Sequence, residues 1–339
     1  MRLSEIRGHE PVRKLIADAA ARGSLPPCLV FAGPEGVGKY QLALALASVV
    51  NCEDDASRLD CCGKCGSCRG IARGAHPDVV TVAPGDTGKI KVDAIRDVLK
   101  QLAYRPFEGH RRVVVINEAD RLVQDAQNAL LKTLEEPPST SMLLLITHRP
   151  NLLLDTVRSR CPQIRFGSLT TEEVENILVS QHELPPATAR AAAAAADGSV
   201  ARALEAGSGD YLEARESAVK VLRALATKPS AKIRLELGTE FSSYQRGAKS
   251  AKAKTVEREG LRLRLRALGT LFRDVQVVSV KGDHGWLANA DLESELVELA
   301  KSYDIYRAGR GFENVDRAVT ALTGNASVKV VADWLTQQI

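Results

Sequence analysis

Residues 28–50 read CLVFAGPEGVGKYQLALALASVV, a short apolar run, a glycine-rich turn and an alanine- and leucine-rich run in succession. The turn fits G-x-x-x-x-G-K, the first part of a phosphate-binding loop, in its usual place between a strand and a helix. The backbone N–H groups around Gly33, Gly36 and Gly38 would surround phosphate oxygens, and Lys39 would reach the terminal phosphates. This stretch predicts a nucleotide-binding α/β core, with a plain turn between strand and helix as the alternative.

Short apolar runs recur along the first half of the chain. They cover residues 28–31, 79–82, 113–116 and 143–146, with a weaker run at 164–166. Each run lacks polar alternation, which is typical of a strand buried on both faces. Stretches with helical spacing lie between them, at 38–50, 93–103 and 120–135. Strands that alternate with helices predict a parallel sheet.

The pattern changes after about residue 167. Residues 170–179 begin with a capping-box sequence and residues 187–196 form an alanine-rich run, so we expect both to be helices. A Gly-Ser-Gly hinge follows at 207–209, and the remainder is mostly helical in its periodicity. Residues 261–266 alternate Leu and Arg like a strand, but their flanks favour a helix. We therefore expect three domains, at 1–167, 168–207 and 208–339.

Two positions depart from what an ATP-hydrolysing site needs. The residue after the loop lysine is normally Ser or Thr, whose hydroxyl holds Mg²⁺, and here it is Tyr40. The strand at 113–116 is normally followed by an aspartate that supports the metal, and here it is followed by the neutral Asn117. Glu118 remains where a base that orients water would lie. Because both changes affect the same ion, the sequence predicts that hydrolysis is lost, and it weakens the case for ATP binding.

Five of the seven cysteines lie between residues 52 and 68. Cys52, Cys62, Cys65 and Cys68 supply four thiolates, with two C-x₂-C steps that share Cys65. Such a set suits a closed, tetrahedral Zn²⁺ site with a structural role better than a redox pair or an unliganded cluster. Cys61 is a spare that could replace Cys62 as a ligand, although Cys62 fits the spacing of the cysteines that follow.

The composition is that of an ordinary globular protein. The chain has 339 residues, of which 45% are hydrophobic and 26% are charged, and its formal net charge is +4. These values exclude a mainly disordered chain, and a content of only six Phe, six Tyr and two Trp argues against recognition by stacking many bases. No run approaches the roughly 18 apolar residues of a membrane span, and the first residues lack the apolar core of a signal peptide. We therefore expect a cytoplasmic protein without a membrane partner.

One segment is more basic than the rest. Residues 246–273 contain nine Lys or Arg residues against two Glu residues. A stripe that faces DNA is one interpretation. A solvated helix with its leucines turned inward is the other, and we prefer it.

Several motifs occur in an order that points to one family. They are Ile6-Arg7-Gly8-His9-Glu10, Gly33 to Lys39, the cysteine module after the loop helix, Asn117 to Asp120, Ala129 to Pro138, and Ser159-Arg160-Cys161. Together they resemble the AAA+ subunits of the bacterial DNA polymerase III clamp loader, the family of the delta prime and tau/gamma subunits. The specific motifs cover residues 1–207. Beyond residue 210 the likeness is weaker, although residues 318–335, with Asn325 between two helical runs, are similar to the end of that family's helical collar.

The resemblance implies a fold and a task. The expected fold is an AAA+ P-loop α/β core with a parallel sheet and an inserted zinc module at 52–68, a small helical lid, and an all-α collar that joins subunits in a ring. Tyr40 and Asn117 depart from the tau/gamma pattern and match the delta prime subunit, whose nucleotide site is commonly degenerate. The chain is thus expected to be a stator, with tau/gamma and delta subunits as partners and the sliding clamp and primed DNA reached through the complex.

Three further residues take their expected roles from the resemblance. Arg160 of the Ser-Arg-Cys motif would act as an arginine finger in the ATP site of the neighbouring subunit, where a planar, always-charged donor meets phosphate charge. Thr147 resembles the sensor of the γ-phosphate, and Arg202 resembles the sensor in the lid.

The resemblance also sets the expectation about enzymatic activity. The expected chain is not an ATPase itself but part of a DNA-directed DNA polymerase holoenzyme. One alternative is an active, tau/gamma-like AAA+ ATPase that tolerates Tyr40 and Asn117. A weaker alternative is a zinc-containing DNA-binding module.

Overall fold

The chain forms two units in the computed structural model, which describes residues 2–54, 59–85, 87–227, 229–243, 251–283, 286–324 and 326–339. The first unit comprises Met1–Glu173 and Gly198–Val200, and the second comprises Val174–Asp197 and Ala201–Ile339. The first unit holds the sheet, and the described part of the second is helical. The finer division into a lid at 168–207 and a collar at 208–339 stays a prediction.

A five-stranded sheet forms the centre of the first unit. Its strands are β1 (Cys28–Ala32), β2 (Val79–Val82), β3 (Arg112–Ile116), β4 (Ser141–Thr147) and β5 (Gln163–Arg165). They lie in the spatial order β2-β3-β4-β1-β5, and every neighbouring pair is parallel. The predicted parallel α/β sheet is confirmed.

Burial of the strands follows their place in the sheet. β1 and β4 are buried along their whole length, as their unbroken apolar runs predict. The prediction that each strand is buried on both faces is wrong for β2 and β5, whose residues are mostly half-buried or exposed. The reason is that both are edge strands with a single neighbour each, β3 for β2 and β1 for β5.

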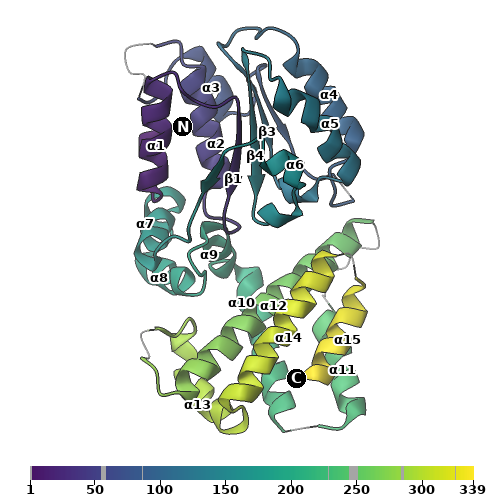
Figure 1. Cartoon of the computed structure of the whole chain (residues 1–339). Helices are drawn as coiled ribbons and strands as arrows, with labels where there is room; N and C mark the ends of the chain where they lie inside the picture. Colours follow the sequence, from purple (N-terminus) through teal and green to yellow (C-terminus); the bar gives the residue numbers. More distant parts are fainter. Residues whose placement is uncertain are drawn as a thin grey trace. The chain divides into compact units, whose positions relative to one another are not determined.

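Helices cover both faces of the sheet (Figure 1). α1 (Glu10–Ala21), α2 (Lys39–Val50) and α3 (Gly66–Ala72) share a core with one face, and α4 (Val92–Leu102), α5 (Gln124–Glu135) and α6 (Asp155–Arg158) share a core with the other. Short 3₁₀ turns η1 (Leu3–Glu5), η2 (Ala119–Arg121) and η3 (Pro150–Leu152) join them. The helix predicted from residue 120 begins only at Gln124, because Glu118 has left-handed backbone (φ 54°) and the next residues form η2.

The remaining helices make up most of the second unit. They are α7 (Thr171–His182), α8 (Pro186–Ala194), α9 (Val200–Ala206), α10 (Gly209–Ala226), α11 (Ala231–Ser242), α12 (Ala251–Ser279), α13 (Glu293–Ser302), α14 (Ile305–Thr323) and α15 (Val328–Gln338), with a 3₁₀ turn η5 (Ala290–Leu292) before α13. Residues 261–266, which alternate like a strand, lie within α12, so the helix interpretation is confirmed. None of the helices in the described ranges combines the length and the hydrophobicity that a bilayer crossing needs.

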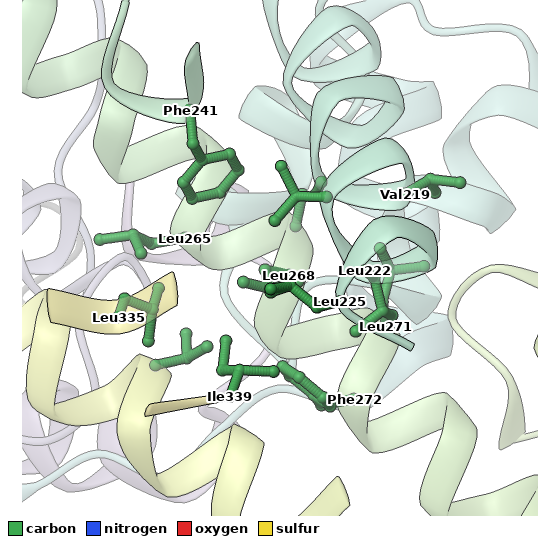
Figure 2. Close-up of a cluster of buried hydrophobic side chains, with 14 of the residues drawn as sticks. Val219, Leu222, Leu225, Phe241, Leu265, Leu268, Leu271, Phe272, Leu335 and Ile339 are labelled. Atoms are coloured by element: carbon green, nitrogen blue, oxygen red, sulfur yellow. The ribbon is translucent and has the colours of Figure 1, made fainter. Parts of the chain in front are cut away.

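The core of the second unit is built around α12 (Figure 2). This helix turns a stripe of large apolar residues inward at spacings of three and four, which is the period of a helix face. The labelled side chains of Figure 2 come from α12 (Leu265, Leu268, Leu271, Phe272), α10 (Val219, Leu222, Leu225), α11 (Phe241), α15 (Leu335) and the final residue, Ile339. The leucines of the alternating stretch therefore pack into this core.

Candidate nucleotide site and metal site

The glycine-rich turn lies at the carboxyl end of β1 and leads into α2. Gly33, Gly36 and Gly38 have φ values of 156°, 75° and 101°, which side-chain-bearing residues rarely adopt. A Cβ atom at Gly33 would lie 2.3 Å from the carbonyl oxygen of Phe166. The turn thus has the backbone of a phosphate-binding loop at the sheet edge where parallel α/β folds bind ligands.

Lys39 is folded back onto this loop. Its side chain is only 6% exposed, and its Nζ donates hydrogen bonds to the carbonyl oxygens of Gly33, at 2.7 Å, and Pro34. Burial lowers the pKa of Lys39 to about 8, against the opposing charges of Glu35 and Asp120. The amine that would reach terminal phosphates is therefore occupied by the loop's own backbone.

The hydroxyl of Tyr40 is engaged by a neighbouring strand. The phenol oxygen and Thr81 Oγ1 of β2 share a hydrogen bond of 3.2 Å. The side chain also packs at the edge of the core beneath β1 and α2. The sequence predicts that Tyr40 cannot replace a metal-binding Ser or Thr, and the geometry supplies a separate structural task for its hydroxyl.

The residues after β3 lie at the same sheet edge. The backbone N–H of Asn117 donates to the carbonyl of Val82, at 2.8 Å, which continues the pairing of β3 with β2. Glu118 is partly buried, and burial raises its pKa, although Arg121 Nε lies 3.7 Å from the carboxylate and opposes the shift. Asn117 is thus a neutral amide where a metal-supporting aspartate would be expected, and the partly buried Glu118 follows it.

Thr147 ends β4 beside the same residues. Its hydroxyl donates to Asp120 Oδ1 at 2.8 Å and accepts a hydrogen bond from the N–H of Arg149 at 3.0 Å. Asp120 also lies 3.4 Å from Nδ1 of His148. The sequence predicts no role for Asp120, because its contact with Thr147 joins residues of two separate strand ends.

Arg160 lies at the other end of the sheet. Its Nη2 donates to Glu135 Oε1 at 2.6 Å and its Nη1 donates to the carbonyl of Thr156 at 3.0 Å. Gln163 is opposite Val30 in the parallel pairing, so Arg160 lies near the amino end of β1 while the phosphate loop follows its carboxyl end. Five strand residues separate the two levels, about 17 Å along the strand.

Arg202 belongs to the second unit and contacts a residue of that unit. Its Nη1 lies 3.6 Å from Asp197 Oδ2. Of the predicted nucleotide-site residues, the first unit thus brings together the loop glycines, Lys39, Tyr40, Asn117, Glu118 and Thr147.

The four predicted cysteines converge. The sulfur atoms of Cys52, Cys62, Cys65 and Cys68 all lie within 4.8 Å of one another, which is close enough to hold one metal ion. Sulfur atoms in this set accept hydrogen bonds from the backbone N–H groups of Cys62, Lys64, Cys65 and Cys68, at 3.2 to 3.5 Å. The N–H groups of Lys64 and Cys65 lower the pKa of Cys62 to about 7, which favours the thiolate that a metal binds. The donor set fits a soft divalent ion such as Zn²⁺.

Most arginines of the basic segment are paired within the second unit. Arg262 and Arg266 both contact Glu205, and Arg273 Nη1 donates to Asp197 at 2.7 Å. Arg264 is buried and donates to the carbonyls of Phe241 and Ser243. Arg246 and Lys249 lie outside the described residues, as do the side chains of Lys252 and Lys254 and the predicted break at Asn325. These contacts favour the interpretation of a packed helix over that of a stripe facing DNA.

The fold and the site define a parallel α/β core with a turn of the phosphate-binding type, followed by a helical region. Comparison with known proteins gives a narrower placement. Residues 8–170 match the protein-family model described as "DNA polymerase III, delta subunit". The chain is 34% identical over 215 residues to the DNA polymerase III subunit delta′ of Bacillus subtilis, and 35% identical over 206 residues to subunit tau of Escherichia coli. The chain is thus similar in sequence to the delta′ and tau subunits of DNA polymerase III.

The likeness covers part of each protein. The matches take in 63% of this chain and 64% of the delta′ subunit, but 59% of this chain and only 32% of the tau subunit. Among solved structures, the gamma subunit-related protein of Thermotoga maritima aligns over 97% of both chains with 16% identity and a TM-score of 0.45.

Proposed function

We propose that this chain is a clamp-loader subunit of a DNA polymerase III holoenzyme that does not hydrolyse ATP and supplies Arg160 to the ATP site of a neighbouring subunit. The absence of ATP hydrolysis is inferred from two residues, Tyr40 and Asn117, which stand where an ATP-hydrolysing site has a Ser or Thr and an Asp. Phosphoryl transfer depends on a metal ion that neutralises the developing charge. Both side chains that would organise this ion are replaced.

The contacts of the phosphate loop support the same proposal. The Tyr40 hydroxyl is bonded to Thr81, and the Lys39 amine is bonded to two loop carbonyls. A nucleotide would have to displace these lysine bonds, and it would find a tyrosine instead of a Ser or Thr at the position after the lysine. Glu118 alone retains a side chain suited to orienting water, and a base without the ion does not make an ATPase.

The position of Arg160 supports a role on a neighbour. It lies at the amino end of the sheet, opposite its own phosphate loop, so it has no route to a nucleotide bound by its own chain. Its partner Glu135 is half-exposed, and exposed ion pairs of this kind contribute less than about 1 kcal/mol. Arg160 can therefore exchange Glu135 for phosphate charge at small cost.

The partners follow from the relatives. We propose that the chain assembles through its C-terminal helices with tau/gamma and delta subunits, and that the complex opens the sliding clamp and places it on primed DNA. The four cysteines hold Zn²⁺ in a structural role, because four thiolates around one ion leave no open coordination position for a substrate.

The test is ATP turnover in the reconstituted complex with clamp and primed DNA. We expect Arg160→Ala to lower the rate at least about twofold, since one neighbouring site loses a finger that is worth orders of magnitude there. Lys39→Ala is expected to leave the rate unchanged. The matched control is Arg158→Ala, which removes another exposed arginine of the same short segment, one paired with Asp155.

The opposite pattern would support the rival function. If Lys39→Ala abolishes a share of the turnover while Arg160→Ala matches Arg158→Ala, the chain is an active ATPase subunit. The proposal of a stator would then be wrong.

A further inference from the structure

The first residues of the chain are tied to the cysteine module. Asp60, which directly precedes the module's middle cysteines, accepts hydrogen bonds from the N–H of Leu3 at 2.8 Å and the N–H of Ser4 at 3.1 Å. It also accepts the Ser4 hydroxyl at 2.7 Å and the N–H of Cys61 at 2.8 Å. The carboxylate of Asp60 therefore joins η1 to the segment that carries the cysteines of the module.

A second contact reinforces this end. Arg2 Nη2 donates to the carbonyl of Cys62 at 2.5 Å. A Cβ atom at Gly63 would lie 2.8 Å from Arg2 Nε, so the arginine rests directly on the turn between Cys62 and Cys65. The contacts of Asp60 and of Arg2 both require the backbone of residues 60–63 to keep the conformation seen in the structure.

The other end of the segment contacts the phosphate loop. His9 has left-handed backbone (φ 51°), and its Nε2 donates to the carbonyl of Val37 at 2.7 Å. Its ring meets the edge of the Phe166 ring, with centroids 5.1 Å apart. The carbonyl of Phe166 lies against Gly33, so His9 and Phe166 together bracket the loop from Gly33 to Val37.

The residues between the two ends are held in place. Leu3 and Ile6 are buried in the core that also contains α1 and α2. Arg13 of α1 donates to the carbonyls of Gly8, at 3.0 Å, and Leu3, at 3.4 Å. Residues 2–9 thus run as an anchored strap alongside α2, from the cysteine module at one end to the phosphate loop at the other.

We infer that this strap couples the two sites: metal in the cysteine module orders the backbone around Asp60 and Cys62, and residues 2–9 carry that order to the phosphate loop through His9. Asp60 and His9 are positioning residues in this device, because neither is placed to touch a metal or a phosphate. The inference goes beyond the proposed clamp-loader role. It is tested on this chain in isolation, so a failure of the coupling can be told apart from a failure of the proposed function.

Lys39 supplies the readout. Its amine is buried and bonded to loop carbonyls, so a looser loop exposes it to acylation. We would pulse the zinc-loaded and the chelated chain with acetic anhydride and measure acetylation of Lys39 by mass spectrometry, relative to the exposed Lys100 of α4. We expect chelation to raise the Lys39/Lys100 ratio at least threefold.

Two matched variants place the coupling in the strap. Asp60→Asn removes one acceptor oxygen from the strap's first tie and is expected to raise the ratio while zinc content stays at one per chain. Glu53→Gln is the control, because Glu53 caps α3 by accepting from Ser67 N at 2.9 Å, within the same module, and does not touch residues 2–9. It is expected to leave the ratio at the wild-type value.

His9→Asn removes the hydrogen bond to Val37 at the other end of the strap. Asn tolerates the left-handed backbone at this position, but its side chain is too short to reach the carbonyl of Val37. In this variant the ratio is expected to be high already, and chelation is expected to add nothing further. If chelation leaves Lys39 unchanged in the wild type, or still changes it in His9→Asn, the coupling does not run through the strap. The effect of chelation in His9→Asn tests the coupling even if Asp60→Asn proves to lose its zinc.

Discussion

At the scale of single residues, Asp78 holds several backbone groups of one loop. Its carboxylate is fully buried and accepts hydrogen bonds from the N–H groups of Phe107, Glu108 and Gly109, at 2.7 to 2.9 Å. It also pairs with Arg112 at 2.8 Å. Burial alone would raise the pKa of Asp78, but these donors outweigh it and bring the pKa down to about 2. The loop before β3 is therefore pinned to the start of β2.

We expect Asp78→Asn to lower the free energy of unfolding by about 3 kcal/mol at pH 7, because it leaves Arg112 without its charge partner. The folded pKa of about 2 lies below the unfolded value of 3.8, so the carboxylate stabilises the fold above pH 4. This contribution, about 2 kcal/mol in full, is lost as the pH falls through 2, and about half of it is gone at pH 3. Urea unfolding at pH 7 and pH 3 measures both effects.

The control for this prediction is Asp97→Asn, whose carboxylate is 68% exposed beside Lys100. Its effect should stay within about 0.5 kcal/mol at either pH. A cost for Asp78→Asn that equals the control, or that does not shrink toward pH 3, would show that the network is not what stabilises this loop.

At the scale of elements, the close packing of α12 and α14 depends on a glycine of α14, Gly311. A Cβ atom at Gly311 of α14 would lie 2.5 Å from the ring of Phe272, a fully buried residue of α12. Gly269 of α12 lies at the same contact between the two helices. A Cβ atom there would have more space, because its nearest neighbour would be Val315 Cγ1 of α14, at 3.6 Å. Two glycines on facing helices thus have opposite structural requirements.

We expect Gly311→Ala to destabilise the second unit by about 1 to 3 kcal/mol, because the ring of Phe272 has no open space to move into. Gly269→Ala should instead stabilise it by about 0.5 to 1 kcal/mol, since alanine is the better helix former and nothing clashes. Tryptophan fluorescence during urea unfolding reports this unit, because Trp286 and Trp334, the two tryptophans of the chain, both belong to it. Equal signs for the two variants would contradict the packing argument.

At the scale of the whole molecule, the two units have separate cores. One cluster of buried residues joins α10 to α15 in the second unit, while two clusters flank the sheet of the first. The cysteine module belongs to the first unit. Because metal binding to thiolates contributes directly to folding free energy, its effect should remain within that unit.

We expect chelation to lower the unfolding midpoint of the first unit by about 5 °C or more, seen by calorimetry, while the tryptophan-detected transition of the second unit stays in place. Zinc analysis should give one ion per chain for the wild type and for Cys61→Ser. Cys62→Ser should lose the ion, since Cys62 lies in the converging set and Cys61 does not. A reversal of these two variants would make Cys61 the ligand.

Much of the candidate site could be predicted from the sequence, because its parts are local. The turn from Gly33 to Lys39 and the C-x₂-C spacing each place their groups within a few residues of one another, so backbone geometry alone brings them together. The alternation of apolar runs with helical stretches likewise determined the parallel sheet, since each pattern reflects the faces that a single element buries.

The tertiary structure decided what depends on residues far apart in the chain. The bond from Tyr40 to Thr81, the contact of Thr147 with Asp120 and the tie from Asp60 to Leu3 join segments from 27 to 57 residues apart. No periodicity or spacing encodes such meetings. The first two arise when the sheet order β2-β3-β4-β1-β5 brings separate strand ends together, and the third arises when η1 packs beside the cysteine module. The same holds for Arg160, whose motif is visible in the sequence but whose place at the end of the sheet opposite the phosphate loop follows from the register of β5 on β1.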